Sequence, residues 1–237
     1  MIGRRQVKAL LGAALLSLSL GSAPALASDW RSLCSGTLDI ARLQACEAAV
    51  ASTEGTAGAL SAQRSLAWAL LRNGEEPRAI TLFAELAAQQ PDDAEAQFDS
   101  AAAHATVWNY EAAAGYLTAA VRQGRRDAST YLLGAIIFEQ LARPAEAFVF
   151  HHRLARLGEP SGMFDLAQDF AGGRGTAMDS DAARAWYERA AEQGHVGAML
   201  ALAEAYRTGG LELAPDADLA ALWAAKAAAA RTAPAAD

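Results

Sequence analysis

The chain has 237 residues, of which 53% are hydrophobic and only 7% aromatic, and alanine supplies much of the difference. Its formal net charge is −7 at pH 7, so the chain lacks the basic balance that binds nucleic acid or anionic lipid. Alanine is the strongest helix former and lets helices approach closely, so this composition favours an all-α fold.

The first 27 residues have the order of a secretory signal peptide. Three basic residues, Arg4, Arg5 and Lys8, precede an apolar run over 9–20, and the small-residue sequence Ala25-Leu26-Ala27 follows. The apolar run is shorter than the ~20 residues that a membrane-spanning helix needs. We therefore predict export to the periplasm, cleavage near Ala27–Ser28 and no permanent membrane anchor. The two arginines leave open whether the general secretory or the twin-arginine route is used.

Cys34 and Cys46 are the only cysteines in the chain. In an oxidising compartment we expect them to form one disulfide. A straight helix over 34–46 would hold their Cα atoms about 18 Å apart, whereas a disulfide needs less than about 7 Å. The chain must therefore reverse, which Ser35-Gly36-Thr37 permits, and a helix that begins near Asp39 would carry Cys46 on its second or third turn. The spacing is not that of a Cys-x-x-Cys redox motif, so we predict a structural role.

Small residues recur along the chain with a period of 34. Two series follow this step: Ala67, Ala101 and Ala135, then Ala79, Ala113 and Ala147. The next matching position is occupied by Phe83, Leu117 and His151. Small residues at fixed points of paired helices mark where one helix must come close to its neighbour, so the period predicts stacked helix pairs.

The three units at 60–93, 94–127 and 128–161 resemble the tetratricopeptide repeat. The first fits best, through Leu66-Ala67, Leu70, Gly74, Ala79-Ile80, Phe83 and Pro91-Asp92. The second lacks the terminal proline. The third has His151 where an aromatic or aliphatic residue is expected.

From Gly162 onward the units change to longer loops that contain glycine. Four elements recur 36 residues later: Met163, Leu166-Ala167, Phe170 and Gly173 match Met199, Leu202-Ala203, Tyr206 and Gly209. The first copy resembles a Sel1-like repeat through Trp186-Tyr187, Ala190-Ala191 and Gln193-Gly194, and the second copy is degenerate. The two resemblances together cover residues 60–231 and imply an exported bacterial member of these repeat families.

We therefore predict an all-α solenoid of antiparallel helix pairs in a right-handed superhelical stack. Its expected parts are an N-terminal helical cap at 28–59, three tetratricopeptide-like repeats at 60–161, two Sel1-like repeats at 162–231 and a disordered tail at 232–237. We expect Asp179 or Asp181, and Asp216 or Asp218, to cap the second helices of the Sel1-like pairs. Glycines 173, 175, 194 and 209 should supply the positive φ angles of the turns.

No residue pattern in the chain indicates catalysis, a metal or a cofactor. His151 and His152 are adjacent on a predicted helix, so they point about 100° apart, and we expect them, like His104 and His195, to be packed or exposed helix residues. The sequence Gly172-Gly173-Arg174-Gly175 lacks the Lys-Ser/Thr of a phosphate loop and is better explained as the Sel1-like turn. We predict that the protein is not an enzyme and needs no cofactor.

The resemblance also implies a binding surface, because the first helix of each tetratricopeptide pair lines a concave groove. The matching positions are Arg64, Trp68, Arg72, Phe98, Thr106, Leu132, Ile136, Glu139 and Gln140. Arg64, Trp68 and Arg72 lie on one helical stripe and suit a carboxylate or an extended peptide. The alternative is that Trp68 packs against the cap and the arginines are solvated.

These observations predict a periplasmic scaffold or adaptor that binds a protein or peptide partner of the cell envelope. Two alternatives stay open. Some cysteine-rich Sel1-like proteins are linked to cell-wall or β-lactam binding, so a peptidoglycan-directed protein is one, although those relatives carry a disulfide in nearly every repeat and this chain has none there. The other is a structural subunit that associates with copies of itself through Trp223 and the last helix.

Overall fold

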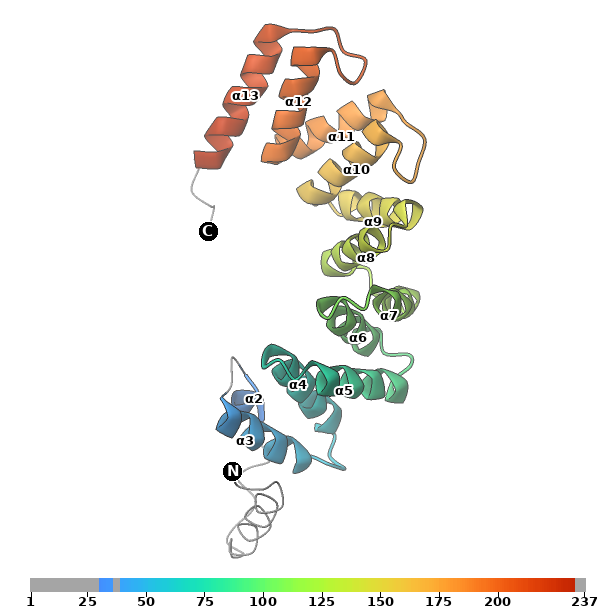
Figure 1. Ribbon diagram of the computed structural model, residues 1–237, viewed down its shortest axis with the longest axis vertical. Helices are drawn as coiled ribbons and strands as arrows, with labels where there is room; N and C mark the ends of the chain where they lie inside the picture. Colours follow the sequence, from blue (N-terminus) through green and yellow to red (C-terminus); the bar gives the residue numbers. More distant parts are fainter. Residues whose placement is uncertain (1–29, 36–38, 233–237) are drawn as a thin grey trace, which may run out of the picture. The chain divides into compact units, whose positions relative to one another are not determined.

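The structure is a computed structural model in which residues 30–35 and 39–232 are described (Figure 1). The predicted signal peptide and the tail beyond residue 232 lie outside these residues. All helices and strands within the described ranges are α-helices, which confirms the all-α prediction. Contacts divide the chain into two compact units, Met1–Glu75 and Glu76–Asp237, and each is described by itself.

The first unit contains three helices in its described part, α2 (Trp30–Leu33), α3 (Ile40–Ala51) and α4 (Ala59–Arg72). A disulfide joins Cys34 to Cys46, whose Cα atoms are 5.1 Å apart, as predicted. The side chain of Asp39 caps α3 by accepting a hydrogen bond from the Arg42 amide at 2.8 Å. This cap starts the helix where the sequence indicated and places Cys46 on its second turn.

A small apolar cluster surrounds this disulfide. Its buried members are Trp30, Cys34, Cys46, Ala49, Val50, Ala62 and Ala69. The guanidinium of Arg72 donates a hydrogen bond to the Cys34 carbonyl at 3.0 Å, which ties the end of α4 to the end of α2. Because so few apolar side chains are buried in this cluster, we expect the disulfide to contribute substantially to the stability of the first unit.

The second unit contains nine helices in the described part of the chain. They are α5 (Glu76–Gln89), α6 (Ala94–Thr106), α7 (Tyr110–Arg122), α8 (Ala128–Gln140), α9 (Pro144–Arg156), α10 (Pro160–Gly172), α11 (Ser180–Glu192), α12 (Val196–Thr208) and α13 (Ala217–Thr232). Each helix packs on the next one along the chain, which is the arrangement of an α-solenoid (Figure 1). The helix bounds differ from the predicted repeat segments at three points: α4 begins at Ala59, α10 begins at Pro160 and α13 ends at Thr232. The two compact units divide the chain between α4 and α5.

Local sequence signals set most helix boundaries in the second unit. Asp179 caps α11 by accepting from the Ala182 amide at 2.8 Å, and Asp216 accepts from the Leu219 amide at 2.9 Å. Further helices are capped by Asp93, Asn109 and Asp127. Pro144 and Pro160 begin α9 and α10, where a missing backbone N–H is least costly.

Small residues permit the close contacts between neighbouring helices. A Cβ atom added to Gly134 would lie 2.4 Å from the Phe150 ring, and one added to Gly162 would lie 2.6 Å from Cβ of Leu154. Neither neighbour can yield without loss of packing. Gly134 is therefore a point at which α8 meets α9, and Gly162 is a point at which α9 meets α10.

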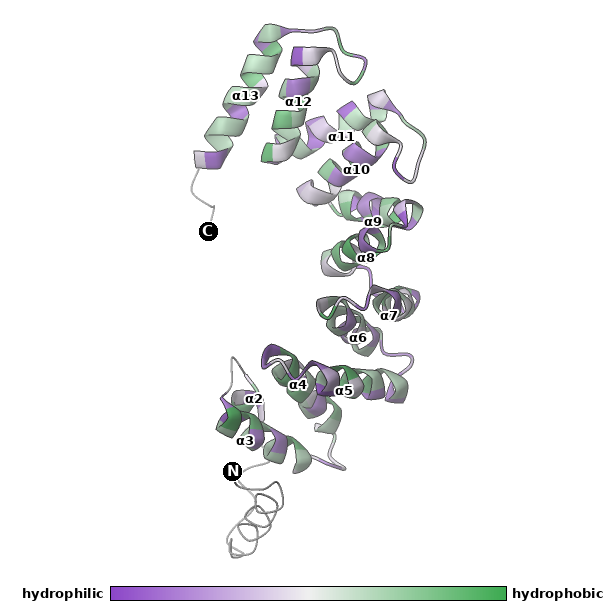
Figure 2. Ribbon diagram, viewed as in Figure 1, coloured by the Kyte–Doolittle hydropathy of each residue, from purple (hydrophilic) through white to green (hydrophobic). Residues whose placement is uncertain are grey.

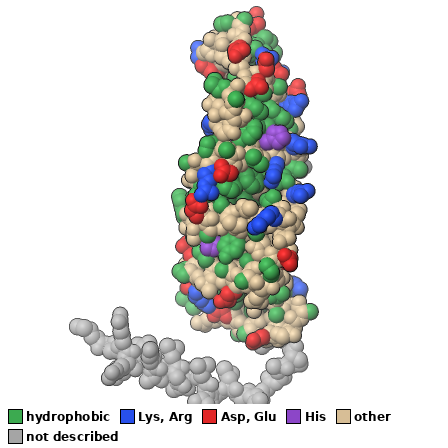
Figure 3. Space-filling view, turned by 90° about the vertical axis from the view of Figure 1, so that its right-hand side faces the viewer, with side chains coloured by type: hydrophobic (Ala, Val, Ile, Leu, Met, Phe, Trp, Pro, Cys, Tyr) green, Lys and Arg blue, Asp and Glu red, His purple; other side chains and the backbone are tan. Residues whose placement is uncertain are grey.

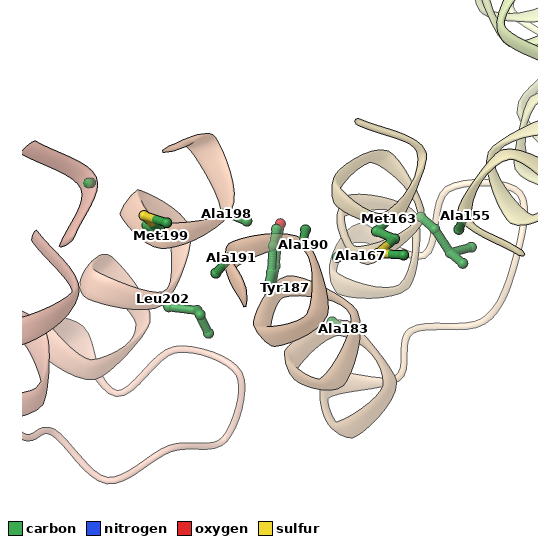
Figure 4. Packing of buried hydrophobic residues seen from close by; sticks show 12 residues of the cluster. Ala155, Met163, Ala167, Ala183, Tyr187, Ala190, Ala191, Ala198, Met199 and Leu202 are labelled. Atoms are coloured by element: carbon green, nitrogen blue, oxygen red, sulfur yellow. The ribbon is translucent and has the colours of Figure 1, made fainter. Parts of the chain in front are cut away.

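Two clusters of buried apolar residues fill the second unit. The first spans α6 to α9 and contains Ala101, Ala113, Ala114, Leu117, Tyr131, Ala135, Ile137, Phe138, Ala147, Phe150 and Leu154. The second spans α9 to α13 (Figure 4) and contains Ala155, Met163, Leu166, Ala167, Ala183, Tyr187, Ala190, Ala191, Ala198, Met199, Leu202 and Ala227. The boundary between them runs along α9, the last helix of the predicted tetratricopeptide-like segment.

Among the helices of the described ranges, none combines the length and the apolar character needed to cross a membrane.

Candidate functional site

The first helices of four pairs in the second unit share one register. α6, α8, α10 and α12 each have 13 residues, so their positions can be compared directly. The fifth residues are Phe98, Leu132, Phe164 and Leu200. Leu132 and Leu200 are each 46% exposed, and the two phenylalanines are half-buried. We call these four residues the apolar row.

On α8 a second exposed apolar residue adjoins Leu132 of the row. Ile136 lies one turn after Leu132 and is 42% exposed, while Tyr131, Ala135 and Phe138 of the same helix are buried in the apolar cluster that spans α6 to α9. Figure 2 shows most of α8 in the colour of hydrophobic residues. A surface helix of a monomer normally carries polar residues on its outer face, so α8 has an uncovered apolar face.

The predicted groove residues Glu139 and Gln140 are exposed at the end of α8. Phe98 is less accessible than the sequence suggested, because the guanidinium of Arg125 lies 3.9 Å from its ring centre. Arg125 is held there by a hydrogen bond to Thr130 at 2.9 Å and by ion pairs with Glu95 and Asp127. A partner would reach Phe98 only beside this cation.

The other predicted contact residues, Arg64, Trp68 and Arg72, belong to α4 of the first unit. Trp68 and Arg72 line a depression of about 430 Å³ together with the disulfide residue Cys34. Since Arg72 binds the Cys34 carbonyl, it has a structural role in the first unit. Trp68 and Arg64 are half-buried, and their part in partner binding remains a prediction.

A cavity of about 230 Å³, lined by charged and apolar residues, lies where α8, α9 and α10 meet, and we call it the junction pocket. Its lining residues are Glu139, Ala142, Arg143, Pro144, Ala147, His151, Asp169 and Arg174. Only Glu139 among them was nominated from the sequence. The pocket therefore joins one predicted contact residue to a set of charged groups that the sequence did not bring together.

His151 forms the buried floor of the junction pocket, with 2% of its surface exposed. Its Nδ1 atom lies 2.6 Å from Oδ2 of Asp169, which is also buried. The other oxygen of Asp169 lies 3.1 Å from the Arg174 guanidinium. Nε2 of His151 lies 3.6 Å from Oε1 of Glu139, which is longer than a hydrogen bond.

The electrostatic surroundings favour a protonated His151. Burial by itself lowers the pKa of His151, but the hydrogen bond to Asp169 and the charges of Asp169, Asp165 and Glu139 outweigh burial, so the pKa lies above its ordinary value. For Asp165, burial raises the pKa, and the net shift is upward although His151 and Arg174 oppose it. A proton on His151 therefore reduces the repulsion among the carboxylates around it.

The loop after α10 places Arg174 over Asp169. Gly173 and Gly175 have φ angles of 65° and 73°, which L side chains rarely adopt. A Cβ atom on Gly175 would lie 2.1 Å from the Pro144 carbonyl oxygen, so the loop rests directly on the first turn of α9. The glycines act as turn residues, as predicted, and the close approach that they allow closes the junction pocket.

The histidines have more specific environments than the sequence indicated. His151 occupies the repeat position that holds the apolar residues Phe83 and Leu117 in the other repeats. A histidine at this buried position indicates a hydrogen-bonded polar contact, because a buried imidazole requires hydrogen-bond partners. His195 caps α12 by accepting from the Ala198 amide at 3.2 Å. His104 is buried and stacks on Tyr116 with ring centres 5.3 Å apart, and burial lowers its pKa. No group of three or more metal-ligating side chains is assembled within the described residues.

No family model matches the sequence, and no curated protein matches it. Solved structures do resemble the fold. A Sel1 repeat protein from Oxalobacter formigenes superimposes with a TM-score of 0.56 at 21% identity, covering 87% of this chain and 83% of that one. YrrB, described as a TPR protein with an unusual peptide-binding site, gives a TM-score of 0.60 at 19% identity, covering 78% of this chain and 93% of that one.

A third similar structure is a protective antigen present in uropathogenic Escherichia coli strains, which displays an SLR fold. Its TM-score is 0.56 at 23% identity, and the match covers 86% of this chain and 46% of that one. At these identities the likeness establishes the fold alone. It confirms the predicted resemblance: the chain has the helical-repeat fold of tetratricopeptide and Sel1-like proteins.

Proposed function

We propose that the chain is an exported scaffold protein that binds a protein or peptide partner along the apolar row of its second unit. The observation that carries the proposal is the outer face of α8, where Leu132 and Ile136 are 46% and 42% exposed one turn apart. Exposed apolar side chains that adjoin one another on a regular surface mark interaction sites more often than isolated ones do.

The partner that fits this surface is an apolar segment with polar or basic flanks. The row itself offers aliphatic and aromatic contacts, and Glu139 stands exposed beside it in a chain of net charge −7. A fold similar to that of YrrB, whose description includes a peptide-binding site, supports a peptide as one form of the partner.

Export to the periplasm is part of the proposal. The basic, apolar and small-residue order of residues 1–27 supports it, and so does the Cys34–Cys46 disulfide, since disulfides persist in oxidising compartments. The test is to fractionate expressing cells and to measure the mass of the recovered protein. A mass that includes residues 1–27, or recovery in the cytoplasmic fraction alone, would refute export.

The side chains that line the junction pocket favour a binding role over a catalytic one. An imidazole that contacts a carboxylate is one half of a nucleophilic site, but no lining residue of this pocket carries a hydroxyl or thiol group. The arrangement therefore suits recognition of a polar group on a partner.

The binding surface is tested by site-specific photo-cross-linking in cells. A photoreactive residue at Ile136 should capture a discrete partner, because Ile136 lies one turn from Leu132 of the apolar row. One at Val149 should not, because Val149 has the same 42% exposure but lies on α9, which carries no residue of the row. The captured partner is then purified, and its affinity is measured for Ile136→Asp and Val149→Asp. Loss of affinity in the first variant alone supports the proposal, and equal affinity of the two variants would refute it.

A further inference from the structure

We infer that two copies of the chain associate through the outer face of α13, with the two helices packed antiparallel. This inference goes beyond the proposed function, because it concerns a different surface and a different partner. The sequence left open a self-association through Trp223 and the last helix, and the structure moves the contact away from Trp223. The indole packs against the apolar cluster that spans α9 to α13, and the Lys226 ammonium lies 4.1 Å from its ring centre.

The second helices of the last three pairs show which face of α13 is uncovered. Counted from their first residues, α9 and α11 bury the fourth, eighth, eleventh and twelfth positions, which are Ala147, His151, Leu154 and Ala155, then Ala183, Tyr187, Ala190 and Ala191. In α13 the fourth and eleventh residues, Ala220 and Ala227, are buried as well. The eighth and twelfth residues, Ala224 and Ala228, are exposed. α13 therefore leaves open a surface that the preceding second helices bury.

This surface is where one helix pair meets the next. A Cβ atom added to Gly162 of α10 would lie 2.8 Å from the Ala155 nitrogen of α9, so α10 packs on the twelfth position of α9. Ala191 of α11 and Met199 of α12 likewise belong to one buried cluster (Figure 4). No helix follows α13 within the described residues. The interface that joins successive pairs thus recurs on α13 with nothing from the described part of the chain packed on it.

The uncovered face of α13 is apolar. Apart from its few charged and polar residues, the exposed side chains of α13 are Ala217, Ala221, Leu222, Ala224, Ala225, Ala228 and Ala229, and Leu222 is 48% exposed. Figure 2 shows most of α13 in the colour of hydrophobic residues. By contrast, Figure 3 shows acidic and basic side chains spread among hydrophobic ones on the side where the α10–α11 connection projects in Figure 1. The end of a helical stack that faces water normally carries polar residues, so this end is suited to a partner.

The charges at the two ends of α13 make a second copy the matching partner. Asp218 lies in the first turn and Arg231 in the last, both are exposed, and neither forms an ion pair within the described ranges. In an antiparallel pair the acidic end of each helix lies beside the basic end of the other, and the helix dipoles also oppose each other. Two-fold symmetry makes this contact twice. A parallel pair would bring like charges together.

The geometry also limits the size and strength of the assembly. A two-fold contact uses the same face of both copies, so association stops at the dimer. α13 has 16 residues and is therefore about 24 Å long. A single helix pair of this length buries less area than a standard stable interface, so we expect a dimer that dissociates in the micromolar range.

Sedimentation equilibrium of the full exported protein tests the inference between about 1 µM and about 300 µM. The average mass should rise from one copy toward two and no further. Ala224→Glu/Ala228→Glu should stay monomeric throughout, because it places charges in the contact while glutamate keeps the helix propensity high. Ala185→Glu is the matched control, because Ala185 is an exposed alanine of α11 outside this face, and it should associate like wild type.

Charge reversal tests the antiparallel arrangement. Asp218→Arg and Arg231→Asp should each raise the dissociation constant of the dimer by about fivefold, since each sets like charges beside one another. The double variant Asp218→Arg/Arg231→Asp should associate within about twofold of wild type, because opposite charges face each other again. Such rescue separates a contact between copies from a mere loss of helix stability.

A wild-type protein that stays monomeric over this range, or equal association of wild type and Ala224→Glu/Ala228→Glu, would overturn the inference. A mass that grows beyond two copies would contradict the two-fold contact, and a double reversal that fails to restore association would contradict the antiparallel one. Ala224 and Ala228 are exposed, so their variant should fold, and the charge reversals decide the matter if it does not. Ile136→Asp should lose the cross-linked partner yet still dimerise, which keeps the two proposals separate.

Discussion

Asp169 places one carboxylate oxygen 2.6 Å from Nδ1 of His151 and the other 3.1 Å from the Arg174 guanidinium. The contact joins α9 to α10 and joins α10 to the loop that follows it. It lies at the boundary between the two apolar clusters of the second unit. At the boundary between the two apolar clusters, a buried polar network thus supplements apolar packing.

Loss of the Asp169 carboxylate should destabilise the second unit strongly. Asp169→Ala leaves a buried imidazole without its acceptor, and breaking one partner of a buried ion pair typically costs about 3–5 kcal/mol of unfolding free energy. The free energy is measured by urea unfolding. The control is Asp181→Ala, which breaks the exposed pair with Arg184 and should cost less than about 1 kcal/mol. Equal effects of the two substitutions would contradict the role given to Asp169.

The contribution of His151 to stability should fall as the pH rises. Burial lowers the pKa of His151, but its carboxylate partners raise it further, so the folded value lies above the ordinary 6.5. A raised folded pKa means that the folded state binds the proton more tightly, so the stabilisation is complete below about pH 6.5 and is lost as the pH rises through the folded value.

His151→Gln isolates this contribution from His104, which acts in the opposite sense because burial lowers its pKa. The difference in unfolding free energy between wild type and His151→Gln should be larger at about pH 5.5 than at about pH 8.5. A difference that is constant with pH, or that grows at high pH, would show that His151 is not held as a cation.

The repeat fold was predictable because its signals are local and periodic. Ala67, Ala101 and Ala135 recur at a fixed step, and a period of this length admits few folds. Asp179 and Asp216 cap the helices that they were expected to cap, since capping depends on the next three residues alone. The disulfide was predictable from the count of two cysteines.

The junction pocket was not predictable in the same way. His151 and Asp169 are 18 residues apart on different helices, and no motif connects them. Their contact depends on how closely α9 and α10 approach, which Gly162 sets by packing against Leu154. Arg174 lies in the glycine-rich segment 172–175, which the sequence identified as a turn without indicating that its arginine contacts Asp169. A contact that forms once, between side chains of two different repeats, does not recur at the repeat period of the sequence, so the period cannot predict it.

Reduction of the disulfide should destabilise the first unit. The bond between Cys34 and Cys46 spans a separation of 12 residues, and closing a loop of about this size contributes about 3 kcal/mol through the unfolded state. Reductant should therefore expose the buried amides of α3 to hydrogen exchange and leave those of α10 and α11 protected. The Cys34→Ala/Cys46→Ala variant should not respond to reductant. Protection of α3 that survives reduction would show that the apolar cluster suffices.

Gly175 and Gly194 provide a matched pair of substitutions. Both have positive φ angles, 73° and 86°, so alanine strains the backbone by about 1 kcal/mol at either position. Gly194 has no neighbour within 4 Å of an added Cβ atom, whereas Gly175 has the Pro144 carbonyl oxygen at 2.1 Å. Gly175→Ala should therefore cost more than Gly194→Ala in unfolding free energy and should shift the His151 ring signal. Equal costs would show that the loop does not rest on α9.

Replacing Trp108 by glycine should stabilise the second unit. Gly74, Trp108 and Ala142 follow the 34-residue period at the turn between paired helices, and all three have positive φ, at 77°, 65° and 52°. Glycine adopts this conformation without strain, whereas a bulky residue does so at a cost of about 1 kcal/mol. The indole is 78% exposed, so its removal forfeits little packing. Trp108→Gly should raise the unfolding midpoint in urea, and Ala142→Gly, the smaller side chain at the same repeat position, should do likewise. The prediction would be contradicted if Trp108→Gly lowered the unfolding midpoint while Ala142→Gly raised it. That result would mean that contacts of the indole stabilise the turn by more than its backbone strain costs.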